Sequence, residues 1–229
     1  VNRTIKSVIK QTYKKFELII VYDDETAEDY HKIKKFIANN KKIRIIKNRK
    51  NIGAGQSRNI GIKNSNGSIV TFIDSDDTWH PQKLKKQLNF LNKNNHNFIF
   101  CGYKKIFKKK SIEVNIDSEY LSYKDLLKSC EIGLSTVMIK KKIIDNNLFT
   151  NLKTQEDFAA WLKITKKHNA FFLNEVLVNW YDTENSLSSN FFQKLFDAYK
   201  VFYLNQKFSL VKSFYYLMIL SANSIKRKF

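Results

Sequence analysis

The chain has 229 residues, of which 43% are hydrophobic, and its formal net charge is +20. This length and hydrophobic fraction exclude a disordered chain and indicate one α/β domain with a small appendage. Only five of the 41 basic residues are arginines, whereas planar, bidentate recognition of phosphate favours arginine. We therefore interpret the charge as a lysine-rich surface, with attraction to an anionic membrane face or an acidic substrate as the alternative.

The two cysteines, Cys101 and Cys130, have no metal-ligand spacing around them. We expect reduced thiols, with a disulfide as the alternative. No stretch of charged and then apolar residues opens the chain as a secretory leader would. These observations predict a cytoplasmic protein.

Buried strands and helical patterns alternate along the first half of the chain. Helices are expected over residues 1–13, around Ile33–Ile37 and around Leu84–Leu91. Short apolar strands are expected at Phe16–Val21, Ile43–Ile46 and Ile69–Ile73. This alternation predicts a doubly wound α/β fold with a mostly parallel sheet, whose ligands gather at the carboxyl ends of the strands.

Two of these strands end in acidic side chains. Asp23 and Asp24 follow the first strand, and Asp74, Asp76 and Asp77 follow the third. Carboxylates this close raise one another's pKa unless a cation lies between them, and magnesium or manganese would leave positions open for substrate phosphates. The pattern predicts a divalent metal and a phosphorylated ligand. A solvated acidic turn before the next helix is the alternative.

Residues 51–62, NIGAGQSRNIGI, lie between the second and third strands. Gly53 and Gly55 stand where a helix should begin, so free N–H groups there could face an anion. A glycine-eased junction between loop and helix is the simpler explanation. Arg58, one turn into the helix, is the better candidate for a functional cation.

The segment TQEDFAAWLKI, residues 154–164, contains a second acidic pair. Thr154 can cap a helix whose first turn holds Glu156 and Asp157, where the helix dipole favours negative charge. The alternative is a general base, because a carboxylate at a helix start can face a cleft while Phe158 and Trp161 anchor the helix.

The chain ends in helical patterns. A strand at Ala170–Trp180 and a polar loop over residues 181–190 precede a helix over residues 191–206. Phe208–Leu220 is almost wholly apolar and is followed by basic residues, but it falls short of the roughly 20 residues that span a bilayer. We expect this helix to lie in the membrane interface or to pack against the domain or a partner.

Five motifs follow one another along the chain: SVIKQTYKKFELIIVYDD, NIGAGQSRNIGIKNSNG, IVTFIDSDDTWHPQKL, QEDFAAWLK and NSLSSN. Together, in this order, they resemble glycosyltransferase family 2, the inverting enzymes with the GT-A fold that use nucleotide sugars. The tail is similar to that of bacterial members that build lipopolysaccharide O-antigen, capsule or other surface glycans. The resemblance implies a Rossmann-like GT-A domain over residues 1–189 and a C-terminal helical appendage over residues 190–229.

The resemblance also implies roles in donor binding. Asp23 and Asp24 match the acidic pair that contacts the base and ribose of the nucleotide. Asp74 and Asp76 match the Asp-x-Asp motif, with Asp76 favoured as the direct metal ligand and Asp74 nearer the ribose and phosphates. Arg58 is expected beside them in the nucleotide-sugar site. The implied cofactor is Mn²⁺ or Mg²⁺.

For catalysis, Asp157 matches the base of the Glu-Asp motif, with Glu156 supporting it. The expected reaction moves a sugar from a nucleotide sugar, with a UDP-sugar favoured, to a glycan or lipid-linked acceptor. We expect it at the inner face of the bacterial cytoplasmic membrane, where the C-terminal helix could bind an anionic surface. No nucleic-acid partner is expected.

The sequence departs from the family pattern at four places. The usual opening strand, which ends in a Pro-x-Tyr-Asn type turn, is not present, and its absence predicts unpaired strand edges. Glu25 replaces a usual glycine, Lys163 a common arginine, and Asp182 another arginine. The alternative functions are therefore a truncated, non-catalytic GT-A module and a basic protein that binds anionic lipid or nucleic acid.

Overall fold

The computed structural model describes residues 1–26, 28–107, 110–145, 147–181 and 191–226. The first half contains α1 (Asn2–Ile9), β1 (Leu18–Tyr22), α2 (Glu28–Ile37), β2 (Ile43–Lys47), α3 (Ala54–Asn64), β3 (Ile69–Thr71), β4 (Thr78–Trp79) and α4 (Lys83–Lys93). The second half contains β5 (Phe98–Phe107), β6 (Lys110–Val114), β7 (Tyr120–Leu121), α5 (Tyr123–Leu126), η1 (Leu134–Thr136), β8 (Met138–Lys140), η2 (Lys141–Ile143), α6 (Glu156–Thr165), β9 (Ala170–Tyr181), α7 (Phe191–Lys200), the π-helical turn η4 (Val201–Asn205) and α8 (Leu210–Lys226).

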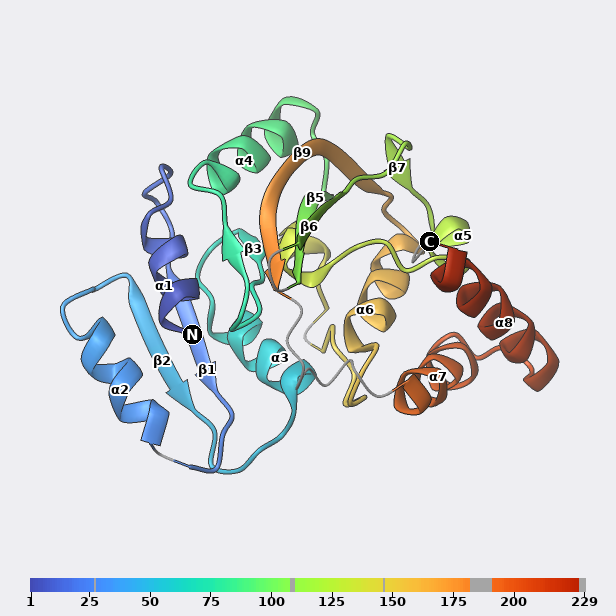
Figure 1. Ribbon diagram of the computed structural model, residues 1–229, viewed down its shortest axis with the longest axis horizontal. Coiled ribbons are helices and arrows are strands. Elements are labelled where there is room, and N and C mark those ends of the chain that lie inside the picture. The colour runs from blue at the N-terminus through green and yellow to red at the C-terminus, as the bar shows by residue number, and fades with distance from the viewer. Residues whose placement is uncertain (27, 108–109, 146, 182–190, 227–229) are drawn as a thin grey trace.

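The N-terminal part of the chain forms a small sheet of its own. β1 and β2 pair in parallel, with Ile20 opposite Ile45. Ile5 of α1 and Ile33 and Ile37 of α2 are buried against these strands in a shared apolar cluster. Figure 1 shows α1, α2, β1 and β2 together at one end of the molecule. The helices and strands expected in this part of the sequence are confirmed, although the first helix ends at Ile9 and not near residue 13.

The larger sheet has the strand order β3-β8-β5-β9-β4, with β6 beside β5 and β7 beside β9. β5 and β9 pair in parallel. Every other pairing described in this sheet is antiparallel. The α/β fold is confirmed, but the expectation of a mostly parallel sheet is wrong. An apolar run shows that a strand is covered on both faces and carries no information on its direction.

Each sheet has an edge that faces the other. Among the described residues, β1 pairs only with β2 and β3 only with β8. Figure 1 shows α3 beside both sheets, and a Cβ on its Gly61 would lie 3.7 Å from the side chain of Val21 in β1. Helix packing therefore takes the place of strand pairing between the two sheets.

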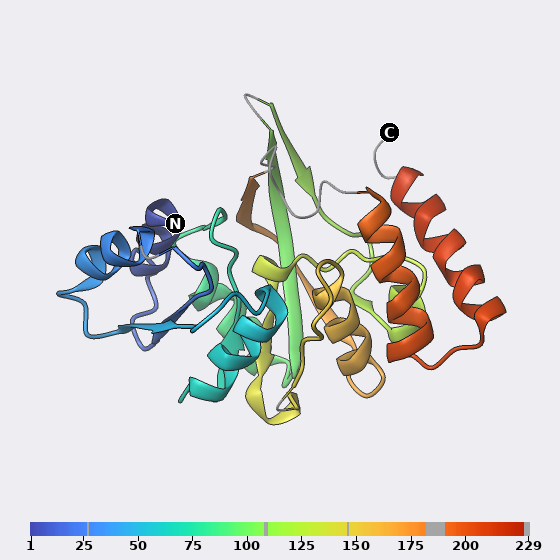
Figure 2. The same cartoon turned by 90° about the horizontal axis from the view of Figure 1, so that it is seen from below.

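Helices cover both faces of the large sheet. Leu84 and Leu91 of α4 pack with Trp79 in one apolar cluster, and Phe158 and Trp161 of α6 are fully buried in the other. Figure 2 shows α6, α7 and α8 together on one side of the sheet. The C-terminal helices share this core through residues such as Val201, Phe202 and Leu220. Among the described residues, no helix combines the length and the hydropathy needed to cross a membrane.

The start of α6 differs from the sequence prediction. Its N-cap is Gln155, in the left-handed conformation with φ of 63°, and no side chain caps it. The Thr154 hydroxyl instead donates to the buried carboxylate of Asp197 in α7, at 3.0 Å. The Thr154 backbone N–H donates to the same carboxylate, also at 3.0 Å. Thr154 therefore ties α6 to the C-terminal helices, and its predicted role as a cap is wrong.

Candidate active site

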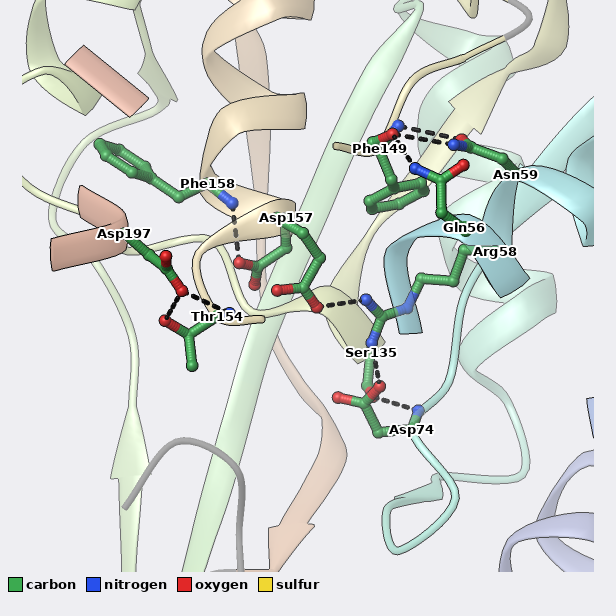
Figure 3. Close-up of polar contacts among 11 residues, drawn as sticks. Gln56, Arg58, Asn59, Asp74, Ser135, Phe149, Thr154, Asp157, Phe158 and Asp197 are labelled. Atoms are coloured by element: carbon green, nitrogen blue, oxygen red, sulfur yellow. Dashed lines mark hydrogen bonds and ion pairs between the residues drawn. The ribbon is translucent and has the colours of Figure 1, made fainter. Parts of the chain in front are cut away.

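Arg58 of α3 joins two of the predicted acidic segments. Its guanidinium donates to Asp74 after β3 at 2.9 Å and to Glu156 at the start of α6 at 2.5 Å. Burial lowers the pKa of Arg58, but the charges of Asp74 and Glu156 raise it more strongly, so this cation is permanent. Figure 3 shows Arg58 between these two segments. Residues almost 100 positions apart in the sequence thus form one charged cluster.

Arg58 can form this bridge because the backbone of α3 lies close to the segment that precedes α6. Two residues on the surface of α3, Gly55 and Asn59, allow this close approach. A Cβ at Gly55 would lie 2.2 Å from the carbonyl oxygen of Thr150, so only glycine lets the helix come this close. One turn further, the Asn59 amide donates to the Phe149 carbonyl at 2.8 Å and accepts from the Phe149 N–H at 3.0 Å. Both contacts hold α3 against the segment that leads into α6 (Figure 3).

Asp157, the predicted base, follows Glu156 at the start of α6. Burial raises its pKa to about 7, and the negative charge of Glu156 adds to this effect. The charge of Arg58 and the Phe158 N–H, which donates to Asp157 at 2.7 Å, act in the opposite direction. A carboxyl group with this pKa can exchange a proton near neutral pH, as a general base must.

The acidic turn after β3 is held by a serine from η1. The Ser135 hydroxyl accepts the Asp74 N–H at 3.1 Å and donates to the Asp77 carboxylate at 2.5 Å. The other Asp77 oxygen accepts the N–H of Tyr181, at the end of β9. Burial, together with the negative charges of Asp74 and Asp76, raises the pKa of Asp77 to about 7. Asp77 therefore points into the protein and fixes the turn that presents its two neighbours.

Asp74 and Asp76 are the predicted metal ligands. Burial raises the pKa of Asp76 and the charge of Asp74 raises it further, so a nearby cation would favour the ionised form. No three acidic, histidine or cysteine side chains form a metal-binding group within the part of the chain that the structure describes. Mg²⁺ typically uses one or two carboxylates and completes its shell with water and substrate phosphates. The donor set of Asp74 and Asp76 fits such a cation.

Asp23 and Asp24, the acidic pair after β1, accept hydrogen bonds from neighbouring loops. Asp23 accepts hydrogen bonds from the Asn48 side chain and the Ile52 and Gly53 N–H groups, at 2.7, 3.0 and 2.8 Å. Asp24 accepts from the backbone and hydroxyl of Thr26. Gly53 has a φ of 86° and its N–H is already engaged, so the suggested free anion-binding N–H is wrong there. Asp23 orders the loop from which α3, and hence Arg58, begins.

Sequence reasoning missed several residues that build this site. Ser135, Asn59 and Asp197 make the contacts that fix the acidic turn and the ends of α3 and α6. Asn59 lies within a motif that was noticed and Asp197 within the predicted helix over residues 191–206, whereas Ser135 lies in a short 3₁₀ turn without apolar periodicity. The predicted departure at Asp182 falls outside the described residues.

Comparison with known proteins identifies relatives over the whole chain. Residues 1–165 match the family model described as glycosyl transferase family 2. The chain is 29% identical to the "Putative teichuronic acid biosynthesis glycosyltransferase TuaG" of Bacillus subtilis, over 100% of this chain and 92% of that protein. It is 30% identical to the "UDP-Glc:alpha-D-GlcNAc-diphosphoundecaprenol beta-1,3-glucosyltransferase WfgD" of Escherichia coli, over 85% of this chain and 77% of that protein.

Solved structures share the fold. S. aureus TarS 1–349 in complex with UDP-GlcNAc superposes with a TM-score of 0.74 at 20% identity, over 93% of this chain and 65% of that chain. The mannosyltransferase PcManGT from Pyrobaculum calidifontis, in complex with GDP-Man and Mn²⁺, gives a TM-score of 0.67 at 12% identity, over 93% of this chain and 64% of that chain. The GT-A fold expected from the sequence is thereby confirmed. The family match covers well over half of the residues, so the chain belongs to glycosyl transferase family 2.

Proposed function

We propose that this chain is a metal-dependent, inverting glycosyltransferase of bacterial cell-surface polysaccharide biosynthesis. It moves a sugar from a nucleotide sugar, in the simplest case a UDP-sugar, to a glycan or lipid-linked acceptor. The observation that carries this proposal is the Arg58 bridge between Asp74 and Glu156, which joins the acidic turn to the proposed base. The names of TuaG and WfgD and the UDP-GlcNAc complex of TarS support the reaction class and the donor.

On the donor side, Asp76 and Asp74 would hold the divalent cation, and Arg58 adds a permanent positive charge beside them. When bound, this cation would supply charge that stabilises the leaving diphosphate. The Mn²⁺ in the PcManGT complex supports the choice of metal. Asp23 and Asp24 remain our proposal for the contacts to the nucleotide base and ribose.

On the acceptor side, Asp157 takes the proton of the attacking hydroxyl. An alcohol is a weak nucleophile until a positioned base removes its proton in the transition state. Glu156 forms an ion pair with Arg58, and its negative charge adds to the burial that raises the pKa of Asp157. A single displacement on the face opposite the leaving group inverts the anomeric centre, so the chain needs no covalent sugar intermediate.

The acceptor that we favour is a sugar linked through a diphosphate to a membrane lipid, as the name of WfgD describes for that enzyme. The exposed face of α8 supports work at a membrane. Its apolar side chains include Val211, Phe214 and Met218, which are 82%, 59% and 56% exposed. A helix of this kind can lie in the headgroup region of a bilayer. We propose a peripheral enzyme on the inner face of the cytoplasmic membrane.

The test is a transfer assay with a panel of UDP-sugars, Mn²⁺ and a GlcNAc-diphospho-alkyl acceptor. We expect UDP release together with a product of inverted anomeric configuration, measured by coupled assay and by NMR. Asp157→Asn and Asp76→Ala should abolish transfer while leaving the circular dichroism spectrum unchanged. Asp29→Asn, on the exposed surface of α2, is the matched control and should transfer normally.

Two results would contradict the proposal. Nucleotide binding without turnover for every donor and acceptor would favour a non-catalytic module. Full activity in Asp157→Asn would remove the proposed base. Loss of transfer after chelation, with recovery on adding Mn²⁺, is the expected metal response.

A further inference from the structure

A cavity of about 510 Å³ lies beside the acidic turn, and its lining residues do not include Arg58, Asp74 or Asp76. It is lined by Arg3, Lys6 and Lys10 of α1 and its C-cap, and by Trp79, Pro81 and Tyr181. The spacing of the three cations puts them on one face of the helix, while Ile5 and Val8 on the other face are buried. Among the described residues that line the cavity, three are cationic and none is acidic.

Direct contacts connect this cavity to the proposed reaction centre. The Arg3 guanidinium donates to the Asp76 carbonyl at 2.8 Å and stacks over the Tyr181 ring, 3.5 Å from its centroid. The Tyr181 N–H in turn donates to Asp77. Two residues that line the cavity, Arg3 and Tyr181, therefore contact the acidic turn at Asp76 and Asp77.

We propose that this cavity binds the diphosphate of a lipid-linked acceptor sugar, with Lys6 and Lys10 as its ligands. This inference rests on the proposed function and names the acceptor subsite. Lys6 and Lys10 line the cavity and are exposed. The Lys6 ammonium lies 5.8 Å from the centroid of the Phe36 ring in α2 and would leave that ring to bind a ligand. Trp79, Pro81 and Tyr181 offer the apolar surfaces that ligand pockets use beside a few polar groups.

The charges along the cavity give the ligand a direction. The Asp76 carboxylate lies near Arg3 and repels an anion at that end, whereas Lys10 lies about 10 Å further along the helix. We therefore assign the diphosphate to the Lys6 and Lys10 end and the sugar to the Arg3 end. In such an acceptor only one sugar separates the diphosphate from the attacking hydroxyl. The donor diphosphate is assigned to the cation at Asp74 and Asp76 and to Arg58, which do not line this cavity, so the two anions do not compete.

The experiment compares two probes that share one sugar and one alkyl chain: GlcNAc-α-diphospho-alkyl and the neutral GlcNAc-α-alkyl. Binding to the full chain is measured by calorimetry without donor, and transfer is measured with donor. We expect Lys6→Gln/Lys10→Gln to weaken binding of the diphosphate probe, and to raise its KM, by at least about tenfold. Binding and KM for the neutral probe, and kcat for both, should not change.

The control is Lys34→Gln/Lys35→Gln, which removes two exposed lysines from α2, outside the cavity. Arg3 is left intact because it touches the acidic turn. If the unmodified chain prefers neither probe, or if both double variants behave alike, the inference is overturned while transfer activity can still support the proposed function. If the diphosphate probe binds through the two lysines but nothing is transferred, the site stands and the proposed function fails.

A third arm separates the acceptor diphosphate from the phosphates of membrane lipids. Vesicles of phosphatidylglycerol and phosphatidylcholine are pelleted with each variant. The inference requires Lys6→Gln/Lys10→Gln to pellet no less than the α2 control. A selective loss of vesicle binding with unchanged affinity for the diphosphate probe would overturn the assignment.

Discussion

Asp157 and Asp77 are both carboxyl groups with a pKa raised to about 7, but their partners differ. Asp77 accepts hydrogen bonds from Ser135 and Tyr181, so both of its oxygens are used inside the protein. Among the described residues, Asp157 accepts the adjacent Phe158 N–H as its one hydrogen bond. The first group holds the turn in place, and the second is the one equipped to take a proton.

The raised pKa of Asp157 predicts how transfer depends on pH. A carboxyl group with a pKa near 7 is mostly protonated at pH 6, so the share of active base grows as pH rises. We expect kcat/KM to increase about tenfold from pH 6 to pH 8, with a midpoint near 7. The measurement is the pH profile of transfer between pH 5.5 and 8.5.

The control for this profile is Asp77→Asn, which removes the other carboxyl group that titrates near pH 7. Its midpoint should stay near 7 even if its rate is lower. A midpoint near 4 in the unmodified chain, or loss of the neutral midpoint in Asp77→Asn, would show that Asp157 is not the titrating base.

Most of the site residues that could be predicted from the sequence were charged residues at the ends of predicted strands and helices. Asp74 and Glu156 were identified from sequence, and the structure connects both to Arg58. Ser135 could not be found in this way because it lies in a short 3₁₀ turn without apolar periodicity. Thr154 was misread because a buried acceptor far along the chain, Asp197, takes its hydroxyl.

At the scale of elements, α3 is the part on which the site depends. It carries Arg58, begins at the loop that Asp23 orders, and contacts the segment before α6 through Asn59. The position of α3 therefore sets whether one cation can meet both acidic segments. Two glycines on this helix, Gly55 and Gly61, allow that position to be tested.

Gly55→Ala should destabilise the fold. Its Cβ would meet the Thr150 carbonyl at 2.2 Å, and the backbone of one partner has to move. Overpacking of this kind costs about 1–3 kcal/mol, and we also expect slower transfer because Arg58 moves away from Glu156. Urea unfolding and the transfer assay measure the two effects.

Gly61→Ala is the matched control on the same helix. Its nearest neighbour would lie 3.7 Å away, which is an ordinary contact. The substitution should leave stability unchanged or raise it by up to about 1 kcal/mol, because alanine restricts the unfolded chain and favours the helix. Equal destabilisation by both substitutions would contradict the close-approach argument.

At the scale of elements, the sequence could not predict whether neighbouring strands run parallel or antiparallel. Ile69, Val70 and Phe72 predicted a buried strand correctly, since helices cover both faces of the sheet. The strand that pairs with it, β8, is only three residues long and comes almost seventy positions later. Its antiparallel return depends on contacts such as the Thr71 hydroxyl bond to the Val137 carbonyl, which leave no periodic pattern.

At the scale of the whole molecule, α8 near the C-terminus carries a group of exposed apolar side chains. Leu210, Val211, Phe214, Tyr215 and Met218 are each more than half exposed and recur at helical spacing. The opposite side of α8 is buried, with Ser213 fully covered and Leu220 in the main core. The helix thus packs against the domain, which was one of the expected arrangements, and it also presents an exposed apolar face.

The exposed face of α8 should control binding to vesicles. We expect Val211→Gln/Phe214→Gln/Met218→Gln to reduce pelleting with phosphatidylglycerol vesicles several-fold, because the apolar area that would enter the interface is lost. Removing the whole helix would also disturb the core around Leu220, so substitutions are the cleaner test. Thermal unfolding should be nearly unchanged.

Ile112→Gln is the control, because Ile112 is 67% exposed on β6. It should pellet like the unmodified chain. Equal pelleting of the triple variant and this control would show that the exposed face of α8 does not contribute to membrane binding. It would leave the lysine-rich surface as the source of any salt-sensitive attraction to anionic lipid.

The separation of the two sheets also has a consequence for how the molecule opens. β1 and β2 share no strand pairing with the larger sheet within the described residues, so their amides can become exposed to solvent without breaking β5 from β9. Native-state hydrogen exchange should then give Ile20 and Ile45 lower protection than Phe100 and Phe172. If so, the part of the chain that carries Asp23 unfolds locally before the larger sheet does. A nucleotide bound to Asp23 would then suppress this local unfolding, because it binds only the folded state.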